Sequence, residues 1–345
     1  MTTTLLRPRS EEELEALLAA PTTETIEAAA RLDGELLVLG AGGKMGPSLG
    51  ALAKRSIDEA GVSHRVICVS RFSSPDVPER LRRLGIEAIV ADLLDRDALR
   101  RLPDAPNVVH LAGMKFGTSG APADTWALNC YLPAILAERF REARIVALST
   151  GNVYPLVPVS GGGADETIEP APVGEYAQSC LGRERMFEYM ASRHGTPVLL
   201  VRLNYATDLR YGVLLDIARK VQRGESVDLS MAAVNTIWQG DANAAIFRAL
   251  ELCDNPPAVL NVTGPEVVSV REAALRFAEL LGTPATFAGN ESDVALLSDA
   301  SRCHGLLGLP RVSVDTLIEW TAEWVRSELP TLDKPTHFET RDGRF

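Results

Sequence analysis

The stretch LLVLGAGGKMG, residues 36–46, decides the fold of this chain. Four apolar residues lead into a glycine-rich turn, and a helix-like segment follows the turn to about residue 60. Glycines 40, 43 and 46 allow the backbone to turn tightly and to pack the helix closely on the strand. The N-terminus of a helix faces anions through its free amides. The stretch therefore predicts a strand, a turn and a helix that bind the pyrophosphate of a dinucleotide.

The same strand-like pattern recurs along the chain. The further apolar runs, separated by helical segments, are VICVS (66–70), AIVAD (88–92), VVHLAG (108–113), RIVALST (144–150) and VLLVRLN (198–204). Strands that are apolar on both faces and alternate with helices are typical of a parallel sheet covered on both sides. The sequence predicts an α/β fold, a doubly wound parallel sheet of the Rossmann type with a smaller C-terminal lobe for the substrate.

This pattern divides the chain into a helical N-terminal extension, an NAD(P)-binding domain, a mainly substrate-binding lobe and a polar tail. In that order the parts cover residues 1–33, 34–203, 204–330 and 331–345. Within the extension, Ser10 and Thr22 are expected to be the N-caps of two short helices. Within the lobe, about 258–282 is expected to return to the first domain.

Composition and charge exclude several classes of function. The chain has 46% hydrophobic residues and a formal net charge of −11. It lacks the basic footprint with which proteins bind nucleic acid or an anionic membrane surface, so we expect neither as a partner. No window is apolar over the roughly eighteen residues that span a bilayer, and the N-terminus lacks the apolar core of a signal peptide.

Cysteine and histidine usage indicates the compartment and argues against metal. The five cysteines are odd in number, widely spaced and without a CxxC pair, which favours reduced thiols and a cytoplasmic protein. The histidines show neither HxxxH nor carboxylate spacing, so we expect no metal site.

The end of the second strand bears on the choice of cofactor. It reads Val69-Ser70-Arg71, without the acidic residue that accepts hydrogen bonds from the adenosine ribose. An arginine at this point suits a 2′-phosphate. We therefore favour NADP, with NAD as the alternative if Arg71 is an ordinary surface charge.

Further segments resemble, in order, the extended short-chain dehydrogenase/reductase family, in particular its NAD-dependent epimerase/dehydratase group. They are Asp92-Leu93 after the third strand, His110-Leu111-Ala112-Gly113 at the fourth, Asn129 in the next helix, Ser149 to Tyr154, and Tyr176. The glycine turn and the resemblance together imply a set of cofactor contacts. This set is Gly40, Gly42, Gly43, Lys44, Met45, Gly46, Arg71, Asp92, Leu93, Leu111, Ala112 and Gly113.

The resemblance also implies a catalytic group. Tyr176 would move a proton to or from a substrate oxygen, Thr150 would steady that oxygen, and Asn129 matches the family's asparagine. The family places a lysine four residues after the tyrosine to lower its pKa, but this chain has Cys180 there. Each unit by which the tyrosine pKa is no longer lowered costs about 1.4 kcal/mol, so the absence of the lysine should slow proton transfer by Tyr176. Arg183, three residues on, is a hypothetical substitute cation; the alternative is a solvated helix charge.

Two motifs that many members of the group use for nucleotide-sugar substrates are absent from this chain, so we expect a different substrate. Gly151-Asn152 follows Thr150 where the 4,6-dehydratases carry Asp-Glu, which argues against their mechanism. The stretch before Asp241 lacks the arginine that holds a nucleotide diphosphate, unless Arg210 or Arg219 replaces it. A smaller polar substrate is expected. Its predicted contacts are Lys115, Asn152, Asn204, Tyr205 and Trp238. For Lys115, in the loop after the fourth strand, the alternative is a mobile loop lysine without a role at the site.

Two functions remain open from the sequence. The first is an NAD(P)-dependent oxidoreductase that acts by hydride transfer on a sugar-like or other polyhydroxylated small molecule. The second is a catalytically impaired, dinucleotide-binding sensor or scaffold protein of the same fold, and Cys180 is the residue that separates the two. The resemblance further implies a homodimer formed by helices within 122–141 and 175–193.

Overall fold

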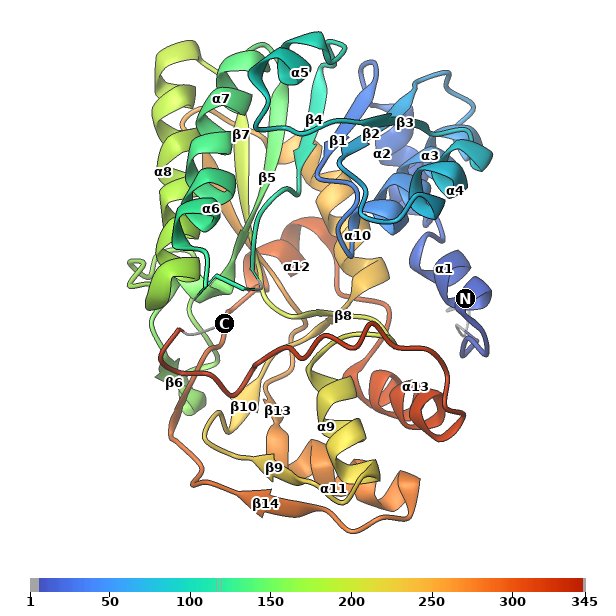
Figure 1. Ribbon diagram of the computed structural model, residues 1–345, viewed down its shortest axis with the longest axis vertical. Helices are drawn as coiled ribbons and strands as arrows, with labels where there is room; N and C mark the ends of the chain where they lie inside the picture. The colour runs from blue at the N-terminus through green and yellow to red at the C-terminus, as the bar shows by residue number, and fades with distance from the viewer. Residues whose placement is uncertain (1–5, 116, 119, 344–345) are drawn as a thin grey trace.

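A seven-stranded parallel sheet forms the centre of the computed structural model, which describes residues 6–115, 117–118 and 120–343 (Figure 1). The strand order is β12-β7-β5-β4-β1-β2-β3, so the chain winds outward in both directions from β1. The strands are β1 Leu36–Leu39, β2 Val66–Ser70, β3 Glu87–Val90, β4 Asn107–His110, β5 Arg144–Thr150, β7 Val198–Leu203 and β12 Ala258–Val262. The predicted doubly wound fold is confirmed.

Alternating residues of β1 explain why the sheet is covered on both faces. Leu36 and Val38 belong to a cluster with residues of α2, α3 and α10, whereas Leu37 and Leu39 belong to a cluster with residues of α5, α7 and α8. All four side chains are fully buried, so a continuous apolar run is what this position requires. The helices flanking the sheet are α2 Thr23–Ala30, α3 Gly46–Glu59, α4 Asp76–Arg83, α5 Arg96–Arg101, α6 Pro122–Trp126, α7 Leu132–Arg139, α8 Gly174–His194, α10 Gln239–Arg248 and α12 Ser301–Leu307.

The N-terminal extension folds as two short helices, α1 Glu11–Leu18 and α2. Ser10 accepts a hydrogen bond from the amide of Glu13, and Thr22 forms a capping box with Thr25, as Ser, Thr and similar residues do at helix starts. Leu14 and Leu18 of α1 are fully buried in the core of the second lobe. The extension is therefore fixed against the body of the protein by apolar packing.

The second lobe lies below the sheet in the view of Figure 1. It contains α9 Val213–Gln222, α11 Val270–Leu281 and α13 Val314–Arg326, packed on one another around a shared apolar core. Four two-stranded pairings complete the fold: β10 Ala233–Val234 with β13 Val268–Ser269, β11 Ile237–Trp238 with β8 Ala206–Thr207, β14 Thr286–Ala288 with β9 Ser226–Asp228, and β15 Val294–Ala295 with β6 Val157–Pro158.

The expected return of residues 258–282 to the first domain ends earlier than the sequence suggests. Strand β12 does pair with β7 in the main sheet. Helix α11 instead packs on α9 and α13, because its apolar stripe, including Ala274 and Phe277, faces the core of the lobe. The return is therefore one strand long.

The polar tail crosses the lobe as an extended segment, drawn dark red in Figure 1. The backbone amide and the hydroxyl of Thr336 both donate hydrogen bonds to Asp216 of α9. Arg341 donates to the carbonyl oxygens of Ser230 and Val294. The described part of the tail thus reaches the start of α8, where Gly343 lies against Gly174.

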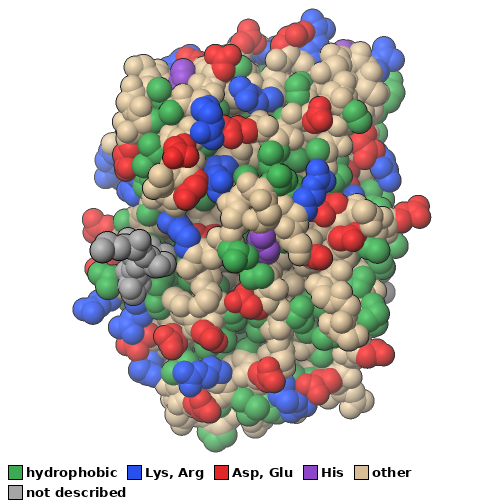
Figure 2. All heavy atoms as spheres, turned by 180° about the vertical axis from the view of Figure 1, so that it is seen from behind, with side chains coloured by type: hydrophobic (Ala, Val, Ile, Leu, Met, Phe, Trp, Pro, Cys, Tyr) green, Lys and Arg blue, Asp and Glu red, His purple; other side chains and the backbone are tan. Residues whose placement is uncertain are grey.

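The surface carries charges of both signs. On the face shown in Figure 2, acidic and basic side chains are interspersed over most of the visible area. Within the described part of the chain, no helix has the length and apolar character needed to cross a membrane.

Candidate active site

Glycines shape the turn after β1 because neighbouring backbone occupies the places of their side chains. Gly40 has a φ of +85°, and a Cβ there would overlap the backbone of Ala112 at the end of β4. A Cβ on Gly46 would overlap the backbone of Ala41. Gly43, in contrast, is exposed, and its nearest neighbour would be the Gly40 carbonyl oxygen at 3.5 Å. Two glycines therefore close the turn, and the third leaves a free surface for a ligand.

One end of the cleft is a cavity of about 470 Å³ beside this turn. It brings together the residues predicted to hold the adenosine part of the cofactor, including Arg71, Asp92 and Leu93. The Arg71 guanidinium lies 4.0 Å from the Asp92 carboxylate, and its side chain is 67% exposed. An accessible cation at the end of β2 fits a 2′-phosphate on the ribose.

The middle of the cleft is a larger cavity of about 690 Å³. The glycine turn, with Lys44, Met45 and Gly46, lines one side. Glu15 of the extension and Lys334 of the tail line the other. The two cavities share Gly40, Gly42, Gly43, Leu111 and Gly113, so together they form a continuous groove along the carboxyl ends of the strands. The residues present therefore fit a bound dinucleotide.

Sequence reasoning missed the part that the extension plays here. Glu15 of α1 forms an ion pair with Arg210 at 2.7 Å and approaches Arg80 of α4 at 3.8 Å. Helix α1 therefore joins the first domain to the lobe across the groove. No local motif announces this contact, because its partners are 65 and more residues away in the chain.

The predicted catalytic pair meets in a third cavity of about 230 Å³, which adjoins the other two. Thr150 ends β5, and Tyr176 lies in the first turn of α8. The Tyr176 phenol lies beside the side chains of Thr150 and Cys180, and both affect its pKa. Burial raises the pKa of the Tyr176 phenol above its ordinary value. The phenol is therefore protonated at neutral pH unless a nearby charge offsets its burial.

Cys180 supplies no such charge. Its side chain is fully buried in a small cluster with Val153 and Tyr154. Burial raises the pKa of the Cys180 thiol, so at neutral pH the group beside Tyr176 is an uncharged thiol.

Arg183 brings the positive charge to this place instead. It is 5% exposed, and its guanidinium donates a hydrogen bond of 2.8 Å to the Asn129 side-chain oxygen and another to the Leu148 carbonyl. Its charge acts to lower the pKa of Tyr176, opposing the effect of burial. The alternative of a solvated helix charge is wrong, because one turn of α8 after Cys180 the side chain points into the protein rather than out of it.

Asn129 holds the loop that follows β4. Its amide group donates to the Met114 carbonyl at 2.9 Å and to the Ser179 hydroxyl at 3.0 Å, and its side-chain oxygen accepts from the Met114 amide. Asn129 is thus fully buried between α8 and the loop that carries Lys115. The role of Ser179 was not predicted from the sequence.

Four of the five predicted substrate contacts line the cavity that contains Tyr176. These are Lys115, Asn152, Asn204 and Tyr205. Lys44 and Tyr211 also line it, although the sequence pointed to the first only as a cofactor contact and did not point to the second.

Trp238 is a correction to the sequence-based expectation. Its side chain is fully buried and packs edge-on against Trp320, with 5.7 Å between the ring centroids. The pairing of β11 with β8 turns the indole into the core of the lobe. Trp238 therefore supports the lobe and does not touch the substrate.

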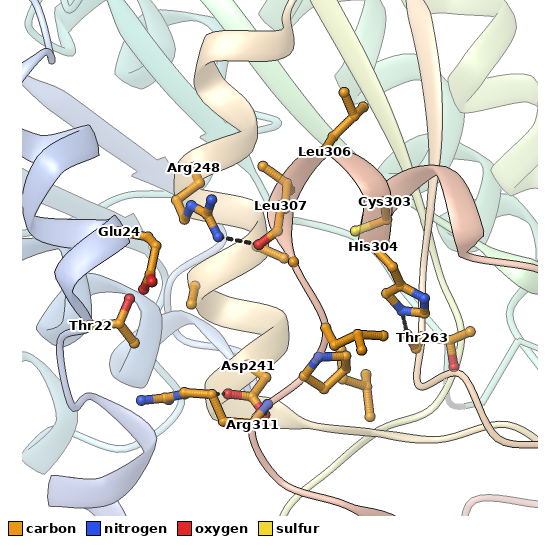
Figure 3. A pocket seen from close by; sticks show the side chains of 16 residues that line it. Thr22, Glu24, Asp241, Arg248, Thr263, Cys303, His304, Leu306, Leu307 and Arg311 are labelled. Atoms are coloured by element: carbon orange, nitrogen blue, oxygen red, sulfur yellow. Dashed lines mark hydrogen bonds and ion pairs between the residues drawn. The ribbon is translucent and has the colours of Figure 1, made fainter. Parts of the chain in front are cut away.

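A separate cavity of about 340 Å³ lies between α2, α10 and α12 (Figure 3). Asp241 accepts hydrogen bonds from the backbone and guanidinium of Arg311, and Arg248 donates to the Leu307 carbonyl. Asp241 thereby secures the loop after α12. These contacts give the aspartate a structural role outside the cleft.

The doubly wound sheet, the glycine turn and the presence of Tyr176 and Thr150 in one cavity define a dinucleotide-binding protein of the short-chain dehydrogenase/reductase type. Comparison with known proteins specifies the group. The NAD dependent epimerase/dehydratase family matches residues 36–262, and the chain belongs to this family.

Individual relatives are more distant. The chain is 28% identical over 231 residues to an L-arabinose 1-dehydrogenase (NAD(P)(+)) of Haloferax volcanii, covering 58% of this chain and 84% of the relative. Its fold is similar to UDP-glucose 4-epimerase of Thermotoga maritima, solved with UDP-glucose (TM-score 0.67, 20% identity, 85% of this chain and 99% of the other). It is also similar to UDP-glucuronic acid 4-epimerase of Bacillus cereus, solved with NAD (TM-score 0.68, 17% identity, 85% and 99%).

Proposed function

We propose that this protein is an NAD(P)-dependent oxidoreductase that transfers a hydride to or from a carbon bearing oxygen on a free, sugar-like small molecule. The observation that carries the proposal is that Tyr176 and Thr150 line one cavity, which adjoins the glycine turn. Two hydroxyl groups at that point suit one substrate oxygen, which accepts a hydrogen bond from each.

Residues of this chain carry out the proton transfer. When bound, the nicotinamide supplies or accepts the hydride. Tyr176 donates a proton to the substrate oxygen during reduction and removes it during oxidation, while Thr150 holds that oxygen by a second hydrogen bond. Arg183 stabilises the phenolate form of Tyr176 by its positive charge. Asn129 fixes the guanidinium in place through a 2.8 Å hydrogen bond.

For the cofactor we propose NADP in preference to NAD. The amides of the glycine turn would hold the pyrophosphate, Asp92 and Leu93 would hold the adenine, and Arg71 would pair with the 2′-phosphate. The resemblance of the chain to a dehydrogenase that uses either nucleotide is compatible with this choice.

For the substrate we propose a free sugar or polyol rather than a nucleotide sugar. The two arginines that might replace the missing diphosphate clamp are engaged elsewhere: Arg210 pairs with Asp208 and Glu15, and Arg219 pairs with Asp333 of the tail. The relative from Haloferax volcanii is named for a free monosaccharide, which fits the small cavity beside Tyr176 better than a nucleotide sugar does.

A homodimer in the cytoplasm completes the proposal. Trp126, Tyr131 and Tyr189 are large side chains that are 38–53% exposed on α6, the turn after it and α8, and aromatic side chains are enriched at protein interfaces. The cysteines Cys68, Cys130, Cys180, Cys253 and Cys303 are all free thiols, as a reducing compartment favours. Light scattering on the purified protein tests the dimer.

Cys180 favours a second candidate function, a dinucleotide-binding sensor or scaffold protein without catalysis. One experiment separates the two. The purified protein is mixed with NADP⁺ or NADPH and a panel of aldoses, ketoses and polyols, and the reduced-nicotinamide absorbance is followed. Turnover that is lost in Tyr176→Phe supports the enzyme. Tight dinucleotide binding without turnover, and none gained in Cys180→Lys, supports the sensor.

A further inference from the structure

We propose that Lys44 and Lys115 form an anion-binding subsite beside Tyr176, and that the substrate is an acidic sugar whose carboxylate or phosphate group binds there. This inference rests on the proposed function and adds the chemical class of the substrate. It is carried by the charges that line the cavity around Tyr176.

Lys44 reaches this cavity from the glycine turn. Its ammonium donates a hydrogen bond of 2.6 Å to the Ala206 carbonyl of β8 and lies 4.3 Å from the centroid of the Tyr211 ring. Both partners belong to the lobe. The side chain therefore crosses the cleft toward the substrate side, while the backbone of the same residue remains part of the turn.

Lys115 reaches the same cavity from the loop after β4. Asn129 fixes this loop by two hydrogen bonds to Met114, the residue before the lysine. The Lys115 ammonium lies 5.7 Å from the centroid of the Tyr205 ring. It is close enough to Lys44 that the positive charge of Lys115 acts to lower the pKa of Lys44. Two ammonium groups on separate loops thus approach one another.

The lining of this cavity is one-sided in charge. It contains Lys44, Lys115 and Arg183, and among its described lining residues none is Asp or Glu. The nearby Asp208 is fully buried and forms an ion pair with Arg210 at 3.1 Å. In a chain with a net charge of −11, a concentration of cations without a carboxylate in the cavity wall indicates a ligand that brings the negative charge.

The protonation of the two lysines agrees with this assignment. Burial lowers the pKa of Lys44 to about 8 and that of Lys115 to about 8. Both ammonium groups are therefore destabilised by their surroundings, and an anion placed between them would relieve this. A tyrosine ring lies beside each of them, Tyr211 beside Lys44 and Tyr205 beside Lys115.

An anionic group can come from two sources, the substrate or the pyrophosphate of the cofactor. Both lysines also line the larger cavity beside the glycine turn. We assign the substrate, because the Lys44 ammonium is bonded to the lobe and because both lysines share the smaller cavity with Tyr176, Asn152 and Asn204, which do not line the larger one. The test below separates the two sources.

The experiment measures dinucleotide binding and turnover for the wild type, Lys44→Met, Lys115→Met and a control, Lys54→Met. Lys54 lies on α3 in an ion pair with Asp58 and lines none of the three cavities of the cleft. The probes are galactose, galacturonate and galactose 6-phosphate, with the corresponding gluco-sugars as a second set. Kd for NADPH is measured by fluorescence titration, and kcat/KM by absorbance. Binding of each probe to the protein–NADP⁺ complex is measured by calorimetry.

We expect the wild type and Lys54→Met to prefer an acidic sugar to its neutral parent by about tenfold or more, because a charge-assisted hydrogen bond is worth that much. In Lys115→Met this preference falls about tenfold through KM, with Kd for NADPH unchanged. The preferred acidic sugar, uronate or phosphate, identifies the anion.

Three results overturn the inference and leave the proposed function standing: faster turnover of neutral sugars, an unchanged preference in both lysine variants, or a loss confined to NADPH affinity. The last result would assign the lysines to the cofactor. If no sugar turns over, the proposed function fails, and calorimetry still decides the subsite: binding of an acidic probe that Lys115→Met weakens supports it, and equal or absent binding contradicts it.

Discussion

The two ends of the cleft are built differently. At the cofactor end, the glycine turn and the loop after β4 supply backbone surface, to which a few side chains such as Arg71, Asp92 and Leu93 are added. At the substrate end, side chains from six separate segments meet, among them Lys44, Lys115, Tyr176 and Tyr205. A short local motif is enough to form a surface of backbone groups. A surface of side chains from distant segments forms only when the whole chain has folded. The cofactor end can therefore be recognised from a short stretch of sequence, whereas the substrate end cannot.

The largest effect is expected from a side chain added to the turn at the cofactor end. Gly46→Ala places a Cβ against the backbone of Ala41, where nothing can yield easily, and we expect a loss of about 3 kcal/mol in the free energy of unfolding. Gly43→Ala has room within the protein, so it should keep its stability and lose dinucleotide affinity. Thermal unfolding and fluorescence titration measure both effects.

Gly305→Ala is the control for this pair, because its Cβ meets nothing within 4 Å. This variant should change the free energy of unfolding by no more than about 1 kcal/mol. Its affinity for the dinucleotide should be unchanged. Equal stability of Gly46→Ala and Gly305→Ala would contradict the view that backbone closeness shapes the turn.

The next effect tests the substrate end. Tyr176→Phe removes the proton donor and keeps the ring, so kcat should fall about 10²- to 10⁴-fold while Kd for NADPH stays within about twofold. Tyr211→Phe, in the same cavity, serves as the matched control and should retain most of the activity. Similar losses of kcat in Tyr176→Phe and Tyr211→Phe would contradict the role of Tyr176 as the proton donor.

A smaller effect follows from the pKa values of the two lysines. With a pKa of about 8, both are charged below that pH and neutral above it. For an acidic sugar, kcat/KM should therefore decline above pH 8, up to about tenfold per pH unit. The value for the neutral parent sugar should not show this decline. Parallel profiles for the two sugars would show that the lysines do not bind the substrate anion.

The smallest effect concerns Arg71. It is exposed and shares its surroundings with Asp92, so Arg71→Ser should raise Kd for NADPH about tenfold, as loss of one exposed charge-assisted contact does. Kd for NADH should be nearly unchanged. Fluorescence titration measures Kd for both nucleotides. An equal change in Kd for NADPH and NADH would show that Arg71 does not bind the 2′-phosphate.

The cofactor end could be predicted from the sequence because each of its features is local. The turn at residues 36–46 and the end of β2 before Arg71 both depend on neighbouring residues. Tyr176 and Thr150, which the resemblance implies as a pair, lie in one cavity, since both lie at the ends of elements that the fold brings together.

The substrate end could not be predicted to the same extent. The sequence around Trp238 does not show whether its side chain faces the cleft or the core. The pairing of β11 with β8 in the structure shows that it faces the core. The contact of α1 with Arg210 joins residues 195 apart. The burial of Arg183 depends on Asn129 and Leu148, which no spacing within α8 reveals.

The central claim is that Arg183 replaces the missing lysine as the cation that activates Tyr176. The direct test is the pH–rate profile of substrate oxidation for the wild type and Arg183→Met. Removing the charge should raise the pKa of Tyr176, so the rising limb of the profile should move to higher pH. The rate at neutral pH should then fall about tenfold for each pH unit that the limb moves. Cys180→Lys in the same variant should move the limb back. A profile that does not move in Arg183→Met contradicts the claim.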